Sequence, residues 1–169
     1  MAPGGLVVLG LDPGSNVTGY GVVAEVSGQV RLLETGCVRT KSSEDFCSRL
    51  GVIFHGVRAV IDKFHPAEAA LEDVFVSRNT ASALKLGQAR GAAVAACAAS
   101  ELPVSGYTPA QVKKSLVGAG RADKEQVAFM VAQVLGVKRI NAPLDATDAL
   151  AVALCHLSMR KYAKLAGLS

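Results

Sequence analysis

Apolar residues follow two different periodicities along this chain, and the change between them separates strands from helices. Residues 6–12 form a short apolar run that ends on a carboxylate, and residues 20–26 and 30–38 form two more such runs. The linker Ser27-Gly28-Gln29 between the last two runs is typical of a tight hairpin. The pattern therefore predicts three antiparallel strands at the start of the chain.

Helical spacing begins after residue 43. Apolar side chains recur every three or four residues at Phe46, Leu50, Ile53, Val57, Ile61 and Phe64. This spacing predicts an amphipathic helix over residues 43–64. Further helices are expected over residues 80–100, 109–116, 123–135 and 145–162, with strands at 67–72 and 104–107.

The order of these elements indicates the fold class. Strands that are separated by helices run parallel to one another. We therefore expect an α/β protein with a five-stranded mixed sheet, antiparallel in its first three strands and then parallel, flanked by helices. The turn GLDPGS lacks the G-x-G-x-x-G loop of a dinucleotide-binding fold. A length of 169 residues fits one domain, so residues 1–169 are expected to form a single unit.

Composition indicates the cellular compartment of the protein but does not indicate its activity. No run approaches the roughly 18 apolar residues that span a bilayer, so no membrane association is expected. Residues 1–5 hold no Lys or Arg, unlike a signal peptide, and the four cysteines are scattered without metal-like spacing. These features predict a reduced, cytoplasmic protein. The net charge of +4 permits an anionic partner without identifying one.

Four acidic residues occupy unusual places in this scheme. Asp12 ends the first predicted strand and Glu72 ends the fourth. Asp145 and Asp148 open the last helix, and their spacing places both on one helical face. Ligand sites of α/β sheets lie at the carboxyl ends of strands. If the first and fourth strands are parallel neighbours, a helix start packed at that edge completes a cluster of four carboxylates.

Such a cluster would repel itself unless cations neutralised it. An all-oxygen ligand set suits Mg²⁺ or Mn²⁺. Two such ions, about 3.5–4 Å apart, can clamp a phosphodiester and stabilise both the attacking and the leaving oxygen. The pattern is therefore compatible with metal-dependent phosphodiester chemistry.

Each acid also has a simpler interpretation. Asp12 precedes Pro13-Gly14, where Asp is a favoured first residue of a turn. Asp145 can cap its helix and Asp148 can favour the helix dipole. Glu72 can be a surface acid at a strand end. Asp73 should point to the opposite face of the sheet, because side chains alternate along a strand.

Four segments resemble the RuvC family of bacterial Holliday-junction resolvases. They are LGLDPGSNVTGYGVV, LEDVFVSRNTASALKLGQARG, QVKKSLVGAGRADKEQV and DATDALAVALCH, in matching order between residues 6 and 156. The resemblance implies a ribonuclease-H-like fold and a homodimer that binds a four-way DNA junction. It also implies symmetric nicking of two strands of like polarity, leaving 5′-phosphate and 3′-hydroxyl ends, in recombination and repair.

The resemblance assigns roles to particular residues. It places the metal ligands at Asp12, Glu72, Asp145 and Asp148, with Mg²⁺ or Mn²⁺ as the cofactor and two ions in each active site. It places Lys113 and Lys124 near the cut phosphate, as catalytic residues. It also implies docking on a RuvA–RuvB branch-migration complex.

Contacts to DNA are expected around the acids. The resemblance gives Phe75 the role of an aromatic that stacks on bases at the junction centre, although the sequence alone equally fits a core residue. Polar and basic residues expected to meet DNA are Arg78, Asn79, Lys85, Arg90, Lys114 and Arg121. Taken singly, each of these charges is typical of a solvated surface. The small residues of helix 80–100 permit close packing, either within the subunit or in a dimer.

Three other functions remain open at this point. A ribonuclease-H-like nuclease acting on RNA would share the first strand and some acids, but should lack the LGQARG segment. A junction-binding protein without cleavage would have lost its metal site, whereas all four acids are present here. An actin-like ATPase would need a second lobe, for which this chain is too short.

Overall fold

The computed structural model describes residues 5–73, 79–118 and 120–167. The strands are β1 (Leu6–Asp12), β2 (Val17–Val26), β3 (Gln29–Arg39), β4 (Glu68–Glu72) and β5 (Val104–Tyr107). The helices are α1 (Phe46–Phe64), α2 (Thr80–Ala98), α3 (Pro109–Val117), α4 (Lys124–Val134) and α5 (Leu144–Leu165). Within the described residues, no helix is long and apolar enough to cross a membrane.

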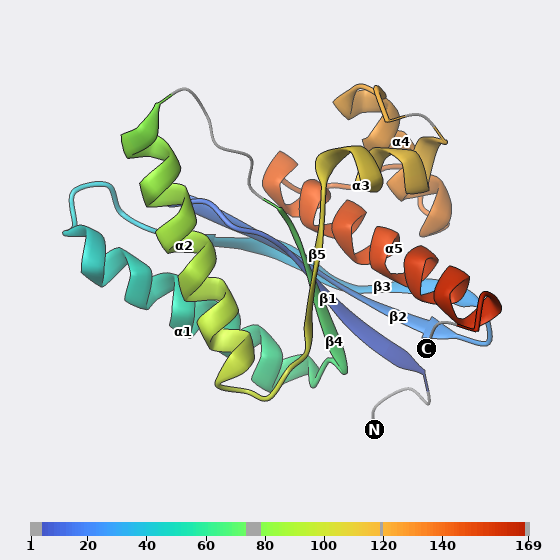
Figure 1. The fold of residues 1–169 in the computed structure, drawn as a ribbon, viewed down its shortest axis with the longest axis horizontal. Coiled ribbons are helices and arrows are strands. Elements are labelled where there is room, and N and C mark those ends of the chain that lie inside the picture. The colour runs from blue at the N-terminus through green and yellow to red at the C-terminus, as the bar shows by residue number, and fades with distance from the viewer. Residues whose placement is uncertain (1–4, 74–78, 119, 168–169) are drawn as a thin grey trace.

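The five strands form one mixed sheet in the order β3-β2-β1-β4-β5 (Figure 1). β1 pairs with β2 and β2 with β3 in antiparallel fashion, while β1–β4 and β4–β5 are parallel pairs. The sequence prediction of an antiparallel front followed by a parallel continuation is therefore confirmed. β1 lies at the centre, next to β4, as the expected cluster of acids requires.

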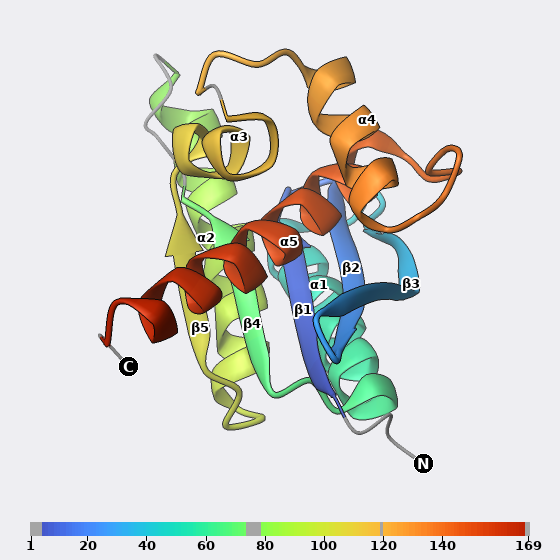
Figure 2. The ribbon, with the colours of Figure 1, turned by 90° about the vertical axis from the view of Figure 1, so that its right-hand side faces the viewer.

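Helices cover both faces of the sheet and create two cores. α1 and α2 pack on one face, around β1 residues Val7, Leu9 and Leu11. α5 crosses the other face, with α3 and α4 packed around it (Figure 2). Side chains alternate along β1 and β4, so even-numbered residues such as Val8 and Ala70 face α5. Asp12 and Glu72 have the same parity and belong to the α5 face.

Several boundaries differ from the sequence prediction. β2 begins at Val17 rather than Tyr20, because the chain pairs with β1 immediately after the turn and places Gly19 opposite Asp12. α1 begins at Phe46, since Asp45 caps it by accepting a hydrogen bond from the Ser48 amide. The hairpin between β2 and β3 is confirmed: its two loop residues have positive φ values of 52° and 78°.

Candidate active site at the carboxyl edge of the sheet

Asp12 and Glu72 lie side by side at the carboxyl ends of adjacent strands. The parallel register pairs Leu11 with Leu71, so the two acids come one residue after the last pair. Neighbouring strands are separated by about 4.8 Å, which keeps both side chains over the same patch of sheet. The predicted sharing of one sheet edge is confirmed.

Two glycines bring the start of α5 onto this edge. A Cβ atom at Gly19, the partner of Asp12 in the ladder, would lie 2.0 Å from the backbone oxygen of Asp145. A Cβ atom at Gly10 would lie 2.0 Å from the backbone oxygen of Ala149. Only residues without side chains permit this approach. The sequence prediction missed these two residues, although glycine inside a strand is a known signal of close backbone approach.

Asp145 does not cap its helix. α5 begins at Leu144, its N-cap is Pro143, and no side chain caps it. Asp145 therefore lies in the first helical turn and Asp148 one turn further, both partly buried. The capping interpretation of Asp145 is wrong, because the N-cap position belongs to Pro143, two residues earlier. Both carboxylates remain available to a ligand.

The four acids lie within electrostatic reach of one another. Burial, followed by the charges of Asp148, Glu72 and Asp145, raises the pKa of Asp12 from 3.8 to about 7. Burial and the charge of Asp148 also raise the pKa of Glu72. At neutral pH the cluster therefore holds carboxylates whose ionised forms are costly in the absence of a compensating cation.

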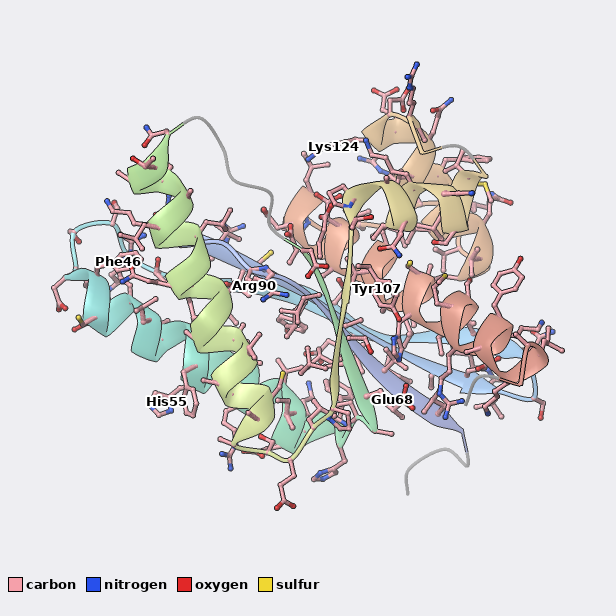
Figure 3. The ribbon with its side chains drawn as sticks, viewed as in Figure 1. Phe46, His55, Glu68, Arg90, Tyr107 and Lys124 are labelled. Atoms are coloured by element: carbon pink, nitrogen blue, oxygen red, sulfur yellow. The ribbon has the colours of Figure 1, made fainter. Side chains whose placement is uncertain are left out.

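Two lysines moderate this negative charge. The Lys124 Nζ atom lies 3.4 Å from Asp148 Oδ2, and its charge lowers the pKa of both Asp12 and Glu72. Lys113 also lowers the pKa of Glu72. Both lysines line one cleft together with Glu72 and Asp148, between α3, α4 and α5. Figure 3 shows Lys124 at the start of α4, above the carboxyl edge of the sheet.

The donor chemistry of this cluster fits divalent metal ions. Carboxylate oxygens are the hard ligands that Mg²⁺ and Mn²⁺ take. Burial and the three neighbouring acids raise the pKa of Asp12, and a bound cation would favour its ionised form. In the part of the chain that the structure describes, no three acidic, His or Cys side chains already converge to hold an ion. Like charges repel, so an incoming cation would draw the carboxylates together.

The turn after Asp12 is held by other residues. The Thr18 hydroxyl donates to the Gly14 carbonyl at 3.1 Å. Arg49 of α1, only 8% exposed, donates to the Ser15 carbonyl at 2.6 Å. Among the described residues, no hydrogen bond involves the Asp12 carboxylate. Asp12 is therefore not needed to form the turn, and its charge remains free for a ligand. The sequence offered no signal for Arg49, which reads as an ordinary polar residue of an amphipathic helix.

The opposite end of β4 carries a second charged cluster. Glu68 begins β4 and accepts hydrogen bonds from Arg160, at 2.9 Å, and from His156, at 2.6 Å. The other ring nitrogen of His156 lies 2.7 Å from the Tyr107 hydroxyl. Figure 3 shows Glu68 far below Lys124. This network ties the middle of α5 to β4 and β5, and sequence analysis did not identify it.

The residues expected to meet DNA lie in different settings. Phe75 and Arg78 fall outside the described residues. Asn79 is the N-cap of α2 and accepts a hydrogen bond from the Ser82 amide.

Arg90 donates to Asp73 at 2.9 Å, which confirms that Asp73 faces away from Glu72 and toward α2. A DNA contact by Arg90 remains a prediction. Among the other expected DNA contacts, Lys85, Lys114 and Arg121 are exposed.

Comparison with known proteins decides between the remaining interpretations. The family model of crossover junction endodeoxyribonuclease RuvC matches residues 8–156. The chain belongs to the RuvC family. The enzyme of that name from Oleidesulfovibrio alaskensis is 57% identical over 166 residues, covering 98% of this chain and 99% of its own.

Solved RuvC structures share the same architecture. Thermus thermophilus RuvC superposes with a TM-score of 0.85 at 39% identity, covering 93% of this chain and 96% of its own. The same relative in complex with a Holliday junction substrate gives a TM-score of 0.88 at 40% identity, with the same coverage. The ribonuclease-H-like fold expected from the RuvC resemblance is thereby confirmed. The family is one of endonucleases rather than nucleotide hydrolases, which argues against an actin-like ATPase.

Proposed function

We propose that this RuvC-family endonuclease resolves four-way DNA junctions by metal-dependent, symmetric nicking of two strands of like polarity. The observation that carries the proposal is the meeting of Asp12, Glu72 and the start of α5 at one sheet edge. The junction complex of the Thermus relative supports the choice of substrate. The expected ends are a 5′-phosphate and a 3′-hydroxyl.

The four carboxylates would hold two Mg²⁺ or Mn²⁺ ions. Bound divalent ions supply Lewis-acid stabilisation of the charge that develops on a phosphodiester during hydrolysis. Asp12 is central among the four acids, since its pKa responds to each of the other three. We therefore assign Asp12 as the central ligand, with Glu72, Asp145 and Asp148 as the further carboxylates that would hold the ions.

The lysines would position the substrate. Lys113 and Lys124 line the same cleft as Glu72 and Asp148, so a phosphate that enters the cleft meets both ammonium groups. Lys124 occupies the first turn of α4, where a cation is unfavourable to the helix dipole. Its ion pair with Asp148 would be exchanged for a phosphate contact when DNA binds. His156 is not free to act as a nucleophile, because both of its ring nitrogens are engaged, with Glu68 and Tyr107.

Further DNA contacts are proposed for one aromatic residue and six polar or basic residues. They are Phe75, Arg78, Asn79, Lys85, Arg90, Lys114 and Arg121. A homodimer would present two active sites to a junction that is itself two-fold symmetric. The small residues of α2 are suited to its interface. We also propose that the protein docks on a RuvA–RuvB complex and acts in the cytoplasm. Residues 1–169 would form one nuclease domain.

The proposal is tested with a mobile four-way junction and a linear duplex of the same sequence, each with Mg²⁺, Mn²⁺ or EDTA. Asp12→Asn is compared with the wild type, and Asp62→Asn on α1 is the matched control because that carboxylate is exposed. We expect paired nicks in the junction alone, lost with EDTA and with Asp12→Asn, while junction binding survives. Binding without cutting under every metal would instead indicate an architectural protein.

A further inference from the structure

The cleft lined by Glu72, Lys113, Lys124 and Asp148 is called the cleft of acids below. A second groove lies on the other side of α3 from it. It runs between α3 and the C-terminal half of α5, lined by Gln111, Lys114, Ser115, Met159 and Tyr162. A hollow of similar size beside it also includes Tyr162, together with Ser158, Lys161 and Leu165. The Tyr162 side chain separates the two hollows and is 69% exposed. We name these two hollows together the α3–α5 groove.

The charge around this groove has one sign. Neither α3 nor residues 156–169 contain any Asp or Glu. Lys114, Lys161 and Lys164 are all exposed on these segments. Glu68 borders the region, but the Arg160 guanidinium already neutralises it. A surface with several exposed lysines and no free carboxylate is complementary to a polyanion.

The groove is continuous with the candidate active site through α3. Consecutive residues of this helix face the two regions: Lys113 lines the cleft of acids, and Lys114 lines the groove. Along α5, Asp148 and Tyr162 are separated by 14 positions, or about 21 Å at the usual helical rise. That length equals about six base pairs of duplex DNA at 3.4 Å each.

We propose that the α3–α5 groove binds the sugar–phosphate backbone of a duplex arm of the junction, about six base pairs from the cut phosphate. This inference rests on the proposed function. Lys114, Lys161 and Lys164 contact phosphates, while the apolar surfaces of Met159 and Tyr162 lie against deoxyribose. Contacts of this kind position the duplex and do not read its sequence.

The test compares junctions whose four arms are closed by hairpin loops after about 5 or about 15 base pairs. Only the longer arms reach the groove. Dissociation constants are measured in EDTA, so that binding is observed without cleavage. The variant is Lys161→Gln/Lys164→Gln, and the matched control is Arg31→Gln/Arg58→Gln, which removes the same charge from β3 and α1. Circular dichroism melting checks that all the proteins are folded.

We expect wild type and control to bind the long-arm junction at least tenfold more tightly than the short-arm junction. The Lys161→Gln/Lys164→Gln variant should lose this difference. Its slope of log affinity against log salt on long arms should fall by about two, one unit for each phosphate contact. A variant that keeps the full arm-length preference would overturn the proposal. So would a change in oligomeric state with unchanged DNA binding, which would indicate that a second copy occupies the groove.

The proposed function is tested separately in the same samples, by measuring strand nicking after a metal is added. Adding Mg²⁺ or Mn²⁺ reports nicking of the short-arm junction by the wild-type protein. Failure to nick would contradict the proposed function, whereas the arm-length comparison in EDTA still decides the role of the groove.

Discussion

The two ends of β4 carry glutamates in opposite electrostatic situations. Glu68, at the beginning of the strand, accepts hydrogen bonds from His156 and Arg160, and these partners hold its pKa below the usual range. Glu72, at the end of the strand, is partly buried beside Asp148, and its pKa is raised. The same helix, α5, faces both glutamates and presents a guanidinium and an imidazole to Glu68 but a carboxylate to Glu72.

The difference separates a structural charge from a functional one. Glu68 is compensated by the protein, so its network stabilises the packing of α5 on the sheet. Glu72 and Asp12 are only partly compensated, by Lys113 and Lys124, and their burial costs stability. Strain of this kind persists at sites where a ligand supplies the missing charge.

The largest expected effect is on catalysis. Glu72→Gln should reduce the rate of junction nicking about a thousandfold, because it removes several kcal/mol of metal-dependent charge stabilisation. Glu68→Gln changes the same side chain at the other end of the strand and should leave the rate per folded molecule within a few-fold of the wild type. Single-turnover cleavage with saturating protein measures both. Equal losses of nicking rate in the two variants would contradict the assignment of a catalytic role to Glu72 and a structural role to Glu68.

A smaller effect is expected where α5 meets the sheet. Gly19→Ala should destabilise the protein by about 1–3 kcal/mol and also reduce nicking, because its Cβ would overlap the Asp145 backbone. Gly51→Ala in α1 is the matched control. Nothing lies within 4 Å of a Cβ there, so it should stabilise the protein by about 0.5–1 kcal/mol. Urea unfolding and cleavage assays report the two effects, and a Gly19→Ala protein with wild-type values would contradict the assigned packing.

The remaining two effects are on stability and have opposite signs. Glu68→Gln should lower the free energy of unfolding at pH 7 by about 1–3 kcal/mol, since it weakens charge-assisted hydrogen bonds. Because the pKa of Glu68 is lowered in the fold, this difference should disappear as the pH falls below the ordinary value of 4.5.

Glu72→Gln should have the opposite effect on metal-free protein at pH 7. The fold raises the pKa of Glu72, so its ionised form costs stability above pH 4.5, and removing the charge should increase the free energy of unfolding. Urea titrations in EDTA at several pH values give both signs. The comparison fails if the two substitutions shift stability in the same direction.

The sequence predicted the strands, their mixed orientation and the strand-end places of Asp12 and Glu72, because these depend on local patterns. The order of the strands in the sheet was only a condition of the expected cluster. The apolar runs located β1 and β4, and their parallel pairing then placed Asp12 beside Glu72. Strand alternation also placed Asp73 on the opposite face, where it pairs with Arg90.

The remaining features depend on which elements pack together. Gly19 has no evident role until α5 is placed on it, and Asp145 is a candidate helix cap until Pro143 is found at the N-cap position of α5. The bonds from Arg49 to Ser15, and from His156 to Glu68, join residues far apart in sequence. No local pattern marks them, since their partners are set by tertiary structure.

Proton release on metal binding tests the central claim most directly. Asp12 has a pKa of about 7 without metal, so it is mostly protonated at pH 6 and must lose its proton to bind a cation. Titration calorimetry with Mn²⁺ in buffers of different ionisation enthalpy should show release of about one proton at pH 6 and close to none at pH 8.5. Asp12→Asn should bind more weakly and release none from this position. Wild-type and Asp12→Asn proteins with the same affinity and the same proton release would contradict the assignment of Asp12 as a metal ligand.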